Sequence, residues 1–446
     1  MKVRPAEEIV AFLSFSSGKD CVPDFGEWTP RQCKRILQWL DDSGLAFYFL
    51  QRLKDRGATS AVPADILERL ETSFASNQER TDDLRQRFDT INARFADAGI
   101  SFAVLKGFSL VPQFCPMAAL RYQGDLDYLV DEHSLAPARR VLNGLGYTEK
   151  ESRSSQEAIF LSPGAKSGFR GGKQYSLQAP HAVELHLDVW DESLHGVSAP
   201  PRLFSPNAAS VRGVDGETFP SLDDADEFLL QVLHACNHLF THWIRMSCLL
   251  EIGYFLNQRS NDWDLWNRVE ERVGTDLKLR EFSVIVAEMA ARLFDCPIPG
   301  PIHRWGASLR PGPRLWLERY SRSWEFADIP VHEFGLFPEA KLVLFLRQQY
   351  RSVCHSDSTA DSSGRRGSRP RQMLTSITRN PALIVNLDWW QRQLLARRIA
   401  FHVMAGLRYV CEIPRWQWRF RNVTRAVRAK SSEAAPVSDL QRSKNT

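Results

Sequence analysis

A short segment of the chain alternates charged and apolar side chains: Asp125 and Asp127 are separated by Leu126 and followed by Tyr128 and Val130. A period of two is typical of a β-strand with one buried face, because successive side chains point to opposite sides of the sheet. Both carboxylates therefore emerge on the same side, close enough to share a divalent cation. Two acids on a rigid strand suit Mg²⁺, which takes oxygen ligands and commonly binds one or two carboxylates with substrate phosphates. The alternative is a strand end that carries two solvated acids.

A second segment, residues 182–190, has the same period, with one apolar face and one face that carries Glu184, His186 and Asp188. If the two strands are neighbours, Glu184 or Asp188 completes a cluster of three carboxylates. Such acids repel one another unless cations neutralise them, so the cluster would imply bound metal. In a two-metal arrangement, one ion and the third acid activate an attacking hydroxyl, and the other ion holds the phosphates. The alternative is an exposed polar face on an edge strand.

The chain turns at Lys106 and Gly107, between a predicted strand over 100–105 and a helix-compatible segment over 108–113. Glycine at such a turn lets the backbone approach phosphate oxygens, and the following helix N-terminus offers unpaired N–H donors. Lys106 and Arg121 are candidates to supply positive charge. An ordinary connection between a strand and a helix uses the same residue types, so the turn alone leaves both interpretations open.

Taken together, these segments resemble a known family. The order that carries the resemblance is Leu105-Lys106-Gly107, then Arg121-x-x-Gly124-Asp125-x-Asp127-x-x-Val130, then Glu184-Leu185-His186. It is similar to the bacterial nucleotidyltransferase-like family labelled uncharacterised nucleotidyltransferase, within the DNA polymerase β-type nucleotidyltransferase superfamily. The resemblance covers roughly residues 30–345 and includes helices on both sides of the motifs.

The resemblance implies an α+β fold, in which a small mixed sheet is flanked by N-terminal and C-terminal helical regions. It also implies that Asp125, Asp127 and Glu184 are the catalytic and metal-binding acids. The cofactor would be Mg²⁺ or Mn²⁺, with an NTP as co-substrate. The leading hypothesis is transfer of a nucleoside monophosphate from an NTP to an unassigned hydroxyl of a small molecule or protein.

In the turn, Gly107 and Ser109 would correspond to the Gly-Ser phosphate turn of the superfamily, with Lys106 and Arg121 nearby. The sequence departs from that pattern, because Phe108 separates the two residues and the gap to the aspartates is longer than usual. The departure keeps a second hypothesis open. In that hypothesis the protein is a catalytically inactive binding or scaffold protein that has retained the fold.

Helical periodicity dominates on both sides of the motifs. We expect five regions: a helical region over 1–95, the nucleotidyltransferase-like domain over 96–215, a helical domain over 216–345, a disordered linker over 346–380 and a basic Trp/Arg-rich helical tail over 381–446. Within the second region, the pattern predicts a helix over 135–145 and short strands near 147–150, 158–161 and 174–178.

Three histidines, His234, His238 and His242, follow one another at intervals of four residues. On a helix this spacing keeps them on one face, with gradual rotation. Two of them have the spacing of transition-metal ligands. The alternatives are packing of the helix against the sheet, or contact with the substrate together with Arg245.

Charge is distributed unevenly. The formal net charge is +4, but residues 346–446 carry +13 and the preceding residues −9. A basic tail points to an anionic partner. A helix that buries its tryptophans on the body of the protein is the first interpretation; an anionic membrane surface is the second, and RNA is the least favoured.

The eight cysteines include no Cys-x-x-Cys pair, which argues against a zinc ribbon or a disulfide framework. The apolar stretches fall short of the ~20 residues that span a bilayer. The first 20 residues lack the sustained apolar segment of a signal peptide. We therefore expect a cytoplasmic protein, and peripheral attachment of the tail to the inner face of the membrane stays open beside it.

Overall fold

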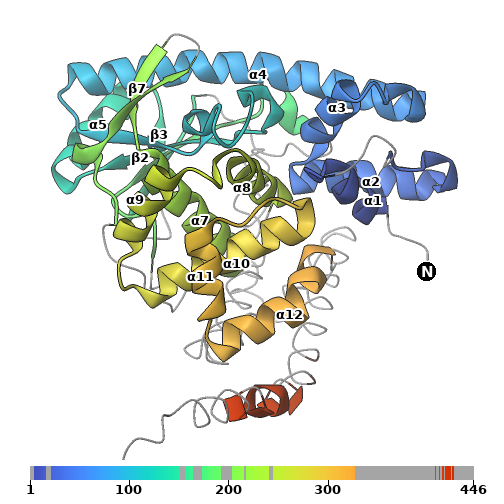
Figure 1. The fold of residues 1–446 in the computed structure, drawn as a ribbon. Helices are drawn as coiled ribbons and strands as arrows, with labels where there is room; N and C mark the ends of the chain where they lie inside the picture. Colours follow the sequence, from blue (N-terminus) through green and yellow to red (C-terminus); the bar gives the residue numbers. More distant parts are fainter. Residues whose placement is uncertain are drawn as a thin grey trace, which may run out of the picture. The chain divides into compact units, whose positions relative to one another are not determined.

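The computed structural model describes residues 5–16, 22–150, 156–163, 173–191, 203–214, 217–240 and 245–326, and some residues between 407 and 425. The chain forms two compact units, one of residues 1–308 with 350–383 and one of residues 309–349 with 384–446. The first unit contains the sheet and the candidate site (Figure 1).

A mixed sheet forms the centre of the first unit, and seven strands of it lie in the described part of the chain. Their spatial order is β3-β4-β5-β2-β1-β7-β6, in which β1 pairs with β7 and β2 with β5 in parallel and the other neighbours are antiparallel. The strands are β1 (Phe102–Leu105), β2 (Asp125–Val130), β3 (Thr148–Lys150), β4 (Glu157–Leu161), β5 (Ala182–His186), β6 (Ser210–Val214) and β7 (Glu217–Ser221). The predicted α+β class is confirmed.

Helices precede, connect and follow the strands. They are α1 (Pro5–Leu13), α2 (Pro30–Ser43), α3 (Ala46–Asp55), α4 (Ala64–Asp97), α5 (Glu132–Gly144), α7 (Asp224–Phe240), α8 (Met246–Arg259), α9 (Trp263–Val273), α10 (Leu277–Phe294) and α11 (Gly300–Ala307) in the first unit, with α12 (Pro311–Phe326) in the second. Local sequence fixes several of their ends. Thr29 and Gln32 form a capping box at the start of α2, and Gly44 ends that helix with a φ of +73°.

The long helix α4 covers one face of the sheet (Figure 1). Leu84, Phe88, Ile91 and Phe95 recur at helical spacing and are at most 1% exposed. The Phe88 ring lies 5.0 Å from the ring of Phe108 and 5.0 Å from that of Phe219. This core also receives alternate side chains of β1, β2 and β5, so the remaining side chains of these strands face away from α4.

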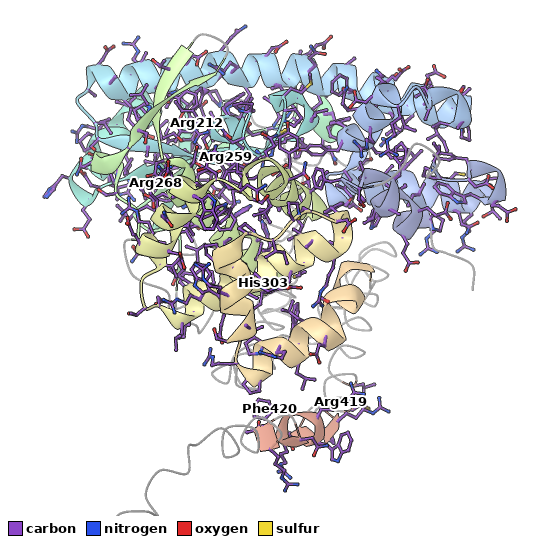
Figure 2. The ribbon with its side chains drawn as sticks, viewed as in Figure 1. Arg212, Arg259, Arg268, His303, Arg419 and Phe420 are labelled. Carbon is purple, nitrogen blue, oxygen red and sulfur yellow. The ribbon has the colours of Figure 1, made fainter. Side chains whose placement is uncertain are left out.

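Asp224 ties the sheet to the helices that cover its other face. Its carboxylate oxygens accept from Arg212 of β6 at 2.9 Å and from Arg259 of α8 at 3.0 Å, and Figure 2 shows the two arginines close together. Asp223 caps the start of α7, because its Oδ1 accepts from the backbone N–H of Asp226 at 2.8 Å.

Several predicted elements differ from the structure. The strand predicted to reach residue 190 ends at His186, so Asp188 lies beyond it. The segment predicted as a strand over 174–178 instead has a 3-10 turn at Lys173–Tyr175, and the segment after Lys106 is a 3-10 turn at Gly107–Leu110 instead of a helix over 108–113. The β6–β7 hairpin was not predicted, although a two-residue Asp-Gly connection between short alternating runs is a hairpin signal.

The C-terminal predictions are largely untested. The linker over 346–380 lies outside the described residues, as do most residues of the tail. Described tail residues between 414 and 425 are helical, and Trp418 among them is 66% exposed. The five predicted regions and membrane attachment stay predictions. Within the described residues, no helix has the length and apolar character needed to cross a bilayer.

The aromatic contacts of Phe88 generate a stability prediction. Phe88→Ala should lower the free energy of unfolding by about 3–5 kcal/mol, because it removes a buried ring and leaves a cavity between α4 and the sheet. Urea unfolding followed by circular dichroism measures the change. Glu79→Ala on the exposed side of α4 should stay within about 0.5 kcal/mol of wild type. Equal effects of the two changes would contradict this account of the core.

His181, which precedes β5, generates a pH prediction. Its Nε2 lies 3.0 Å from the Tyr147 hydroxyl oxygen, and burial, followed by Arg87 and Arg80, lowers the pKa of His181 to about 4. The pKa of this histidine in the unfolded chain is about 6.5. The unfolded chain therefore takes up a proton at a higher pH than the folded protein does. The contribution of this histidine to the free energy of unfolding is thus highest above pH 6.5 and decreases as the pH falls toward 4. The loss should approach about 3 kcal/mol.

Urea unfolding of wild type and His181→Gln across this pH range tests the prediction, and their difference in stability should shrink or reverse as the pH falls. Tyr147→Phe is the matched control, since it removes the hydroxyl partner but leaves the imidazole buried, so its pH dependence should follow wild type. Parallel profiles for wild type and His181→Gln would show that the imidazole does not titrate as described.

Candidate functional site

The two acid-bearing strands lie side by side. In the parallel pairing of β2 with β5, the partner of Asp127 is Glu184 and the partner of Asp125 is Ala182. The adjacency on which the three-carboxylate hypothesis depended is therefore present. Asp127 and Glu184 extend from the face of the sheet that points away from α4, since their strand neighbours Tyr128 and Leu185 belong to the core under that helix.

Asp127 is the most contacted acid of the cluster. It is 4% exposed, and its Oδ1 lies 3.0 Å from Lys106 Nζ and 2.9 Å from His186 Nε2. The same His186 nitrogen lies 3.6 Å from Oε2 of Glu184. Ligand-type atoms of Asp127, Glu184 and His186 all lie within 4.8 Å of one another. Three residues from two strands therefore converge on a space of the size that one ion fills.

The three acids differ in their protonation. Burial alone would raise the pKa of Asp127, but Lys106 and His186 outweigh it and hold that pKa well below the usual range. Burial, followed by the charges of Asp127 and Asp125, raises the pKa of Glu184 well above its ordinary value. Asp125 is the more exposed aspartate, yet restricted hydration at the wall of the site and the Asp127 charge raise its pKa. The cluster holds more negative charge than its two basic partners neutralise.

Lys106 is the lysine whose ammonium group lies against the acid cluster. Burial would lower the pKa of its ammonium group, but Asp127, Asp125 and Glu184 outweigh that effect and raise the pKa. The backbone of Lys106 has a φ of +56° and a ψ of −159°, a region that side-chain-bearing residues rarely adopt and that costs about 1–3 kcal/mol. The fold thus holds this lysine against the acids in a strained conformation.

Gly107 continues the turn with a φ of +54°. A Cβ atom added there would lie 2.3 Å from Nε2 of Gln123, and the same Nε2 donates to the backbone carbonyl of Asp125 at 3.1 Å. The glycine therefore lets the turn after β1 pack closely against the start of β2. This close approach places Lys106 beside the aspartates.

Ser109 lies inside the turn. Its side chain is buried, and its hydroxyl lies 2.9 Å from the backbone carbonyl oxygen of Lys106 and 3.2 Å from Oε2 of Glu227 in α7. Burial raises the pKa of Glu227, which also accepts from Gln231 at 2.9 Å. The structure does not bring Ser109 into the acid cluster, and its contact with phosphate stays a prediction.

Arg121 is anchored at the edge of the site. Its Nε donates to Oε1 of Glu251 in α8 at 2.8 Å, and the Tyr48 hydroxyl donates to the same oxygen at 2.8 Å. The guanidinium also reaches the carbonyl of Gly107 at 3.5 Å. Burial alone would lower the pKa of Arg121, but Glu251 outweighs it and the group stays charged. Arg121 supports the turn in this arrangement, and its role toward phosphates stays a prediction.

Asp188 does not join the cluster. It lies after the end of β5, and its Oδ1 accepts from the backbone N–H of Trp190 at 3.3 Å. It lines a hollow beside the acids, together with Lys106, His186, Asp191 and His234. Of the two candidates for the third acid, Glu184 is the one that the strand pairing places beside Asp127.

His234 and His238 face one another on α7, with their Nε2 atoms 3.1 Å apart, and Cys248 of α8 completes a group whose ligand-type atoms lie within 4.8 Å. His242 lies outside the described residues. Burial, followed by Lys106 and His238, lowers the pKa of His234 well below its ordinary value, so its imidazole is neutral; Arg121 and Arg245 act in the same direction. The role of these histidines stays a prediction.

Sequence reasoning did not single out three residues of this region. His186 was predicted to share a strand face with Glu184, but it was assigned no role in the site. Cys248 and Glu251 lie on α8, far along the chain, and nothing in their spacing links them to the turn. The structure supplies that link through packing of α7 and α8 against the site.

The site combines carboxylates from two adjacent strands of a mixed sheet with a neighbouring glycine turn. This combination defines a candidate centre for metal-dependent phosphate chemistry. The comparison with family models agrees with this class. Residues 29–295, more than half of the chain, match the model described as uncharacterised nucleotidyltransferase, and the chain belongs to that family. The comparisons with curated proteins and with solved structures gave no match.

The Gly107 turn generates a prediction. Gly107→Ala should lower the free energy of unfolding by more than about 1 kcal/mol, because it combines a strained φ with a collision against Gln123. Gly57→Ala is the matched control, since Gly57 has a φ of +65° with nothing within 4 Å of an added Cβ. It should cost less in the same urea titration, whereas an equal cost would show that the close approach to Gln123 is unimportant.

Proposed function

We propose that the protein is a divalent-metal-dependent nucleotidyltransferase that moves a nucleoside monophosphate from an NTP to a hydroxyl of a small molecule or protein. The observation that carries the proposal is the pairing of Asp127 with Glu184 on adjacent strands, with Lys106 Nζ 3.0 Å from Asp127. Family membership supports the reaction class.

The residues present fit a divalent ion. Asp125, Asp127 and Glu184 offer carboxylate oxygens, the ligands that Mg²⁺ and Mn²⁺ take in phosphate-transfer sites. Burial and the neighbouring acids raise the pKa values of Asp125 and Glu184, so further positive charge would stabilise their ionised forms. A bound ion would supply that charge, orient the phosphates and increase the acidity of the acceptor hydroxyl.

The chain's own residues have separable roles in this proposal. Glu184 accepts the proton of the acceptor hydroxyl, a role that its raised pKa favours. The acceptor oxygen then bonds to the α-phosphorus, the bond from that phosphorus to the bridging oxygen breaks, and pyrophosphate leaves with the bonding electron pair. Lys106 moves from Asp127 toward the departing phosphates and stabilises their charge. Asp125, Asp127 and one carboxylate oxygen of Glu184 would hold the ion, which leaves the second oxygen of Glu184 for the proton.

A second candidate is an inactive scaffold that keeps the fold. Two contacts favour it: the Ser109 hydroxyl lies against Glu227, and Arg121 is held by Glu251. Both side chains are thus engaged by carboxylates of the following helices. Calorimetric titration of the full chain with each NTP and Mg²⁺ or Mn²⁺ separates the candidates, since a folded protein that binds no nucleotide would be a scaffold.

Asparagine substitutions test the transferase proposal. Asp125→Asn and Asp127→Asn should each lower metal-dependent nucleotide transfer about 100-fold or more, because they remove a charged ligand without changing side-chain size. Transfer of labelled NTP to protein or to candidate hydroxyl acceptors measures the loss, and circular dichroism checks the fold. Asp264→Asn, on the exposed side of α9, is the control. Undiminished transfer by both aspartate variants would rule out this assignment.

A further inference from the structure

We propose that His186 is a direct ligand of the divalent ion, beside Asp127 and Glu184, and that the site therefore prefers Mn²⁺ to Mg²⁺. The inference rests on the proposed function, because it assigns a further ligand and a metal preference to the same site. It differs from an arrangement of carboxylates alone in adding a nitrogen donor.

The strand pattern gives His186 its place. Glu184 and His186 lie two residues apart on β5, and their neighbours Val183 and Leu185 are fully buried in the core under α4. The acid and the imidazole therefore share the other face of the strand. In the strand register, His186 pairs with Leu129, the second residue after Asp127. The imidazole therefore lies two residues further along β5, on the same face of the sheet as the Asp127–Glu184 pair.

The distances match those between neighbouring ligands of one ion. Ligand atoms at adjacent corners of an octahedron around Mg²⁺ or Mn²⁺ are about 3 Å apart when the metal–ligand distance is about 2.1 Å. His186 Nε2 lies 2.9 Å from Asp127 Oδ1 and 3.6 Å from Glu184 Oε2. The imidazole side chain is 12% exposed, which leaves it little freedom to point elsewhere.

Lys106 marks the place of the cation. Its Nζ lies 3.0 Å from the same Oδ1 of Asp127 that His186 contacts. The ammonium group therefore lies where positive charge is favoured, within reach of the same oxygen as the imidazole. An imidazole that carries its proton on Nδ1 would offer the Nε2 lone pair to the ion, and Lys106 would then be available for phosphates.

Donor chemistry sets the preference. Mg²⁺ binds oxygen ligands and gives up its water reluctantly, whereas imidazole nitrogen suits transition metals. Mn²⁺ accepts carboxylate oxygens and also nitrogen. A mixed set of Asp127, Glu184 and His186 therefore favours Mn²⁺.

Pulsed electron paramagnetic resonance of the full-length protein with Mn²⁺ and a non-hydrolysable NTP analogue tests the ligand directly. Wild type should show electron-spin-echo modulation from a coordinated ¹⁴N, and labelling the histidines with ¹⁵N should change the modulation frequency. His186→Gln should abolish the signal while Mn²⁺ still binds. His234→Gln and His238→Gln are the matched controls from the same region, and both should keep it.

The outcomes separate this inference from the proposed function. If Mn²⁺ binds in an Asp127-dependent way without nitrogen modulation, His186 only positions Asp127 and the inference is overturned, whereas the proposed function stands. Modulation that survives in His186→Gln also overturns it. If wild type binds no Mn²⁺ with the NTP analogue, the proposed function itself fails. Because the labelled wild-type protein already reports a histidine ligand, the test does not depend on one variant folding.

The metal preference has its own readout. Calorimetric titrations should show that His186→Gln weakens Mn²⁺ binding about 10-fold or more, while Mg²⁺ binding changes less. The ratio of the Mg²⁺ to the Mn²⁺ dissociation constant should therefore fall in the variant. An unchanged ratio would contradict a nitrogen ligand, since loss of a purely structural contact weakens both ions alike.

Discussion

Parallel pairing of β2 with β5 is the constraint on which the candidate site depends. It places Asp127 beside Glu184 and leaves Leu126 with Val183, and Tyr128 with Leu185, as paired side chains under α4. A slip of one residue would turn Glu184 into the apolar core and Val183 out of it, so burial under α4 fixes the register. The same hydrophobic surface that stabilises the sheet thus concentrates carboxylates on its opposite face. Their repulsion is only partly offset by Lys106 and His186, and a binding site for further positive charge follows from the fold.

The turn after β1 is stabilised largely by residues that point away from the acids. Ser109 contacts Glu227 of α7, and Arg121 contacts Glu251 of α8. These partly buried polar contacts hold Lys106 and Gly107 in backbone conformations with positive φ. Backbone strain of this kind persists only where many surrounding contacts hold the residue in place. Helices α7 and α8 therefore support the site indirectly, because they stabilise the turn that places Lys106 beside Asp127.

Much of the site could be predicted from local sequence, and the remainder depends on contacts between distant segments. The alternation around Asp125 and Glu184 was enough to predict two strands with acids on one face, because a period of two is a local property. Family resemblance then predicted the α+β class that the structure has. The inward orientation of Ser109 was not accessible, because it depends on Glu227 more than a hundred residues away. The end of β5 at His186 was also missed, because the alternation continues beyond the point where pairing with β4 and β2 stops. Pairing, burial and ion pairs between distant helices decide such details.

The central claim is that Asp127 and Glu184 hold a divalent ion that in turn holds the nucleotide. A crystal structure of the protein with Mn²⁺ and a non-hydrolysable NTP analogue tests it most directly, through the anomalous difference map of manganese. The account predicts an anomalous peak between Asp127 and Glu184, in contact with a phosphate oxygen of the analogue. Nucleotide bound elsewhere, or bound at these acids with no manganese peak, would contradict it.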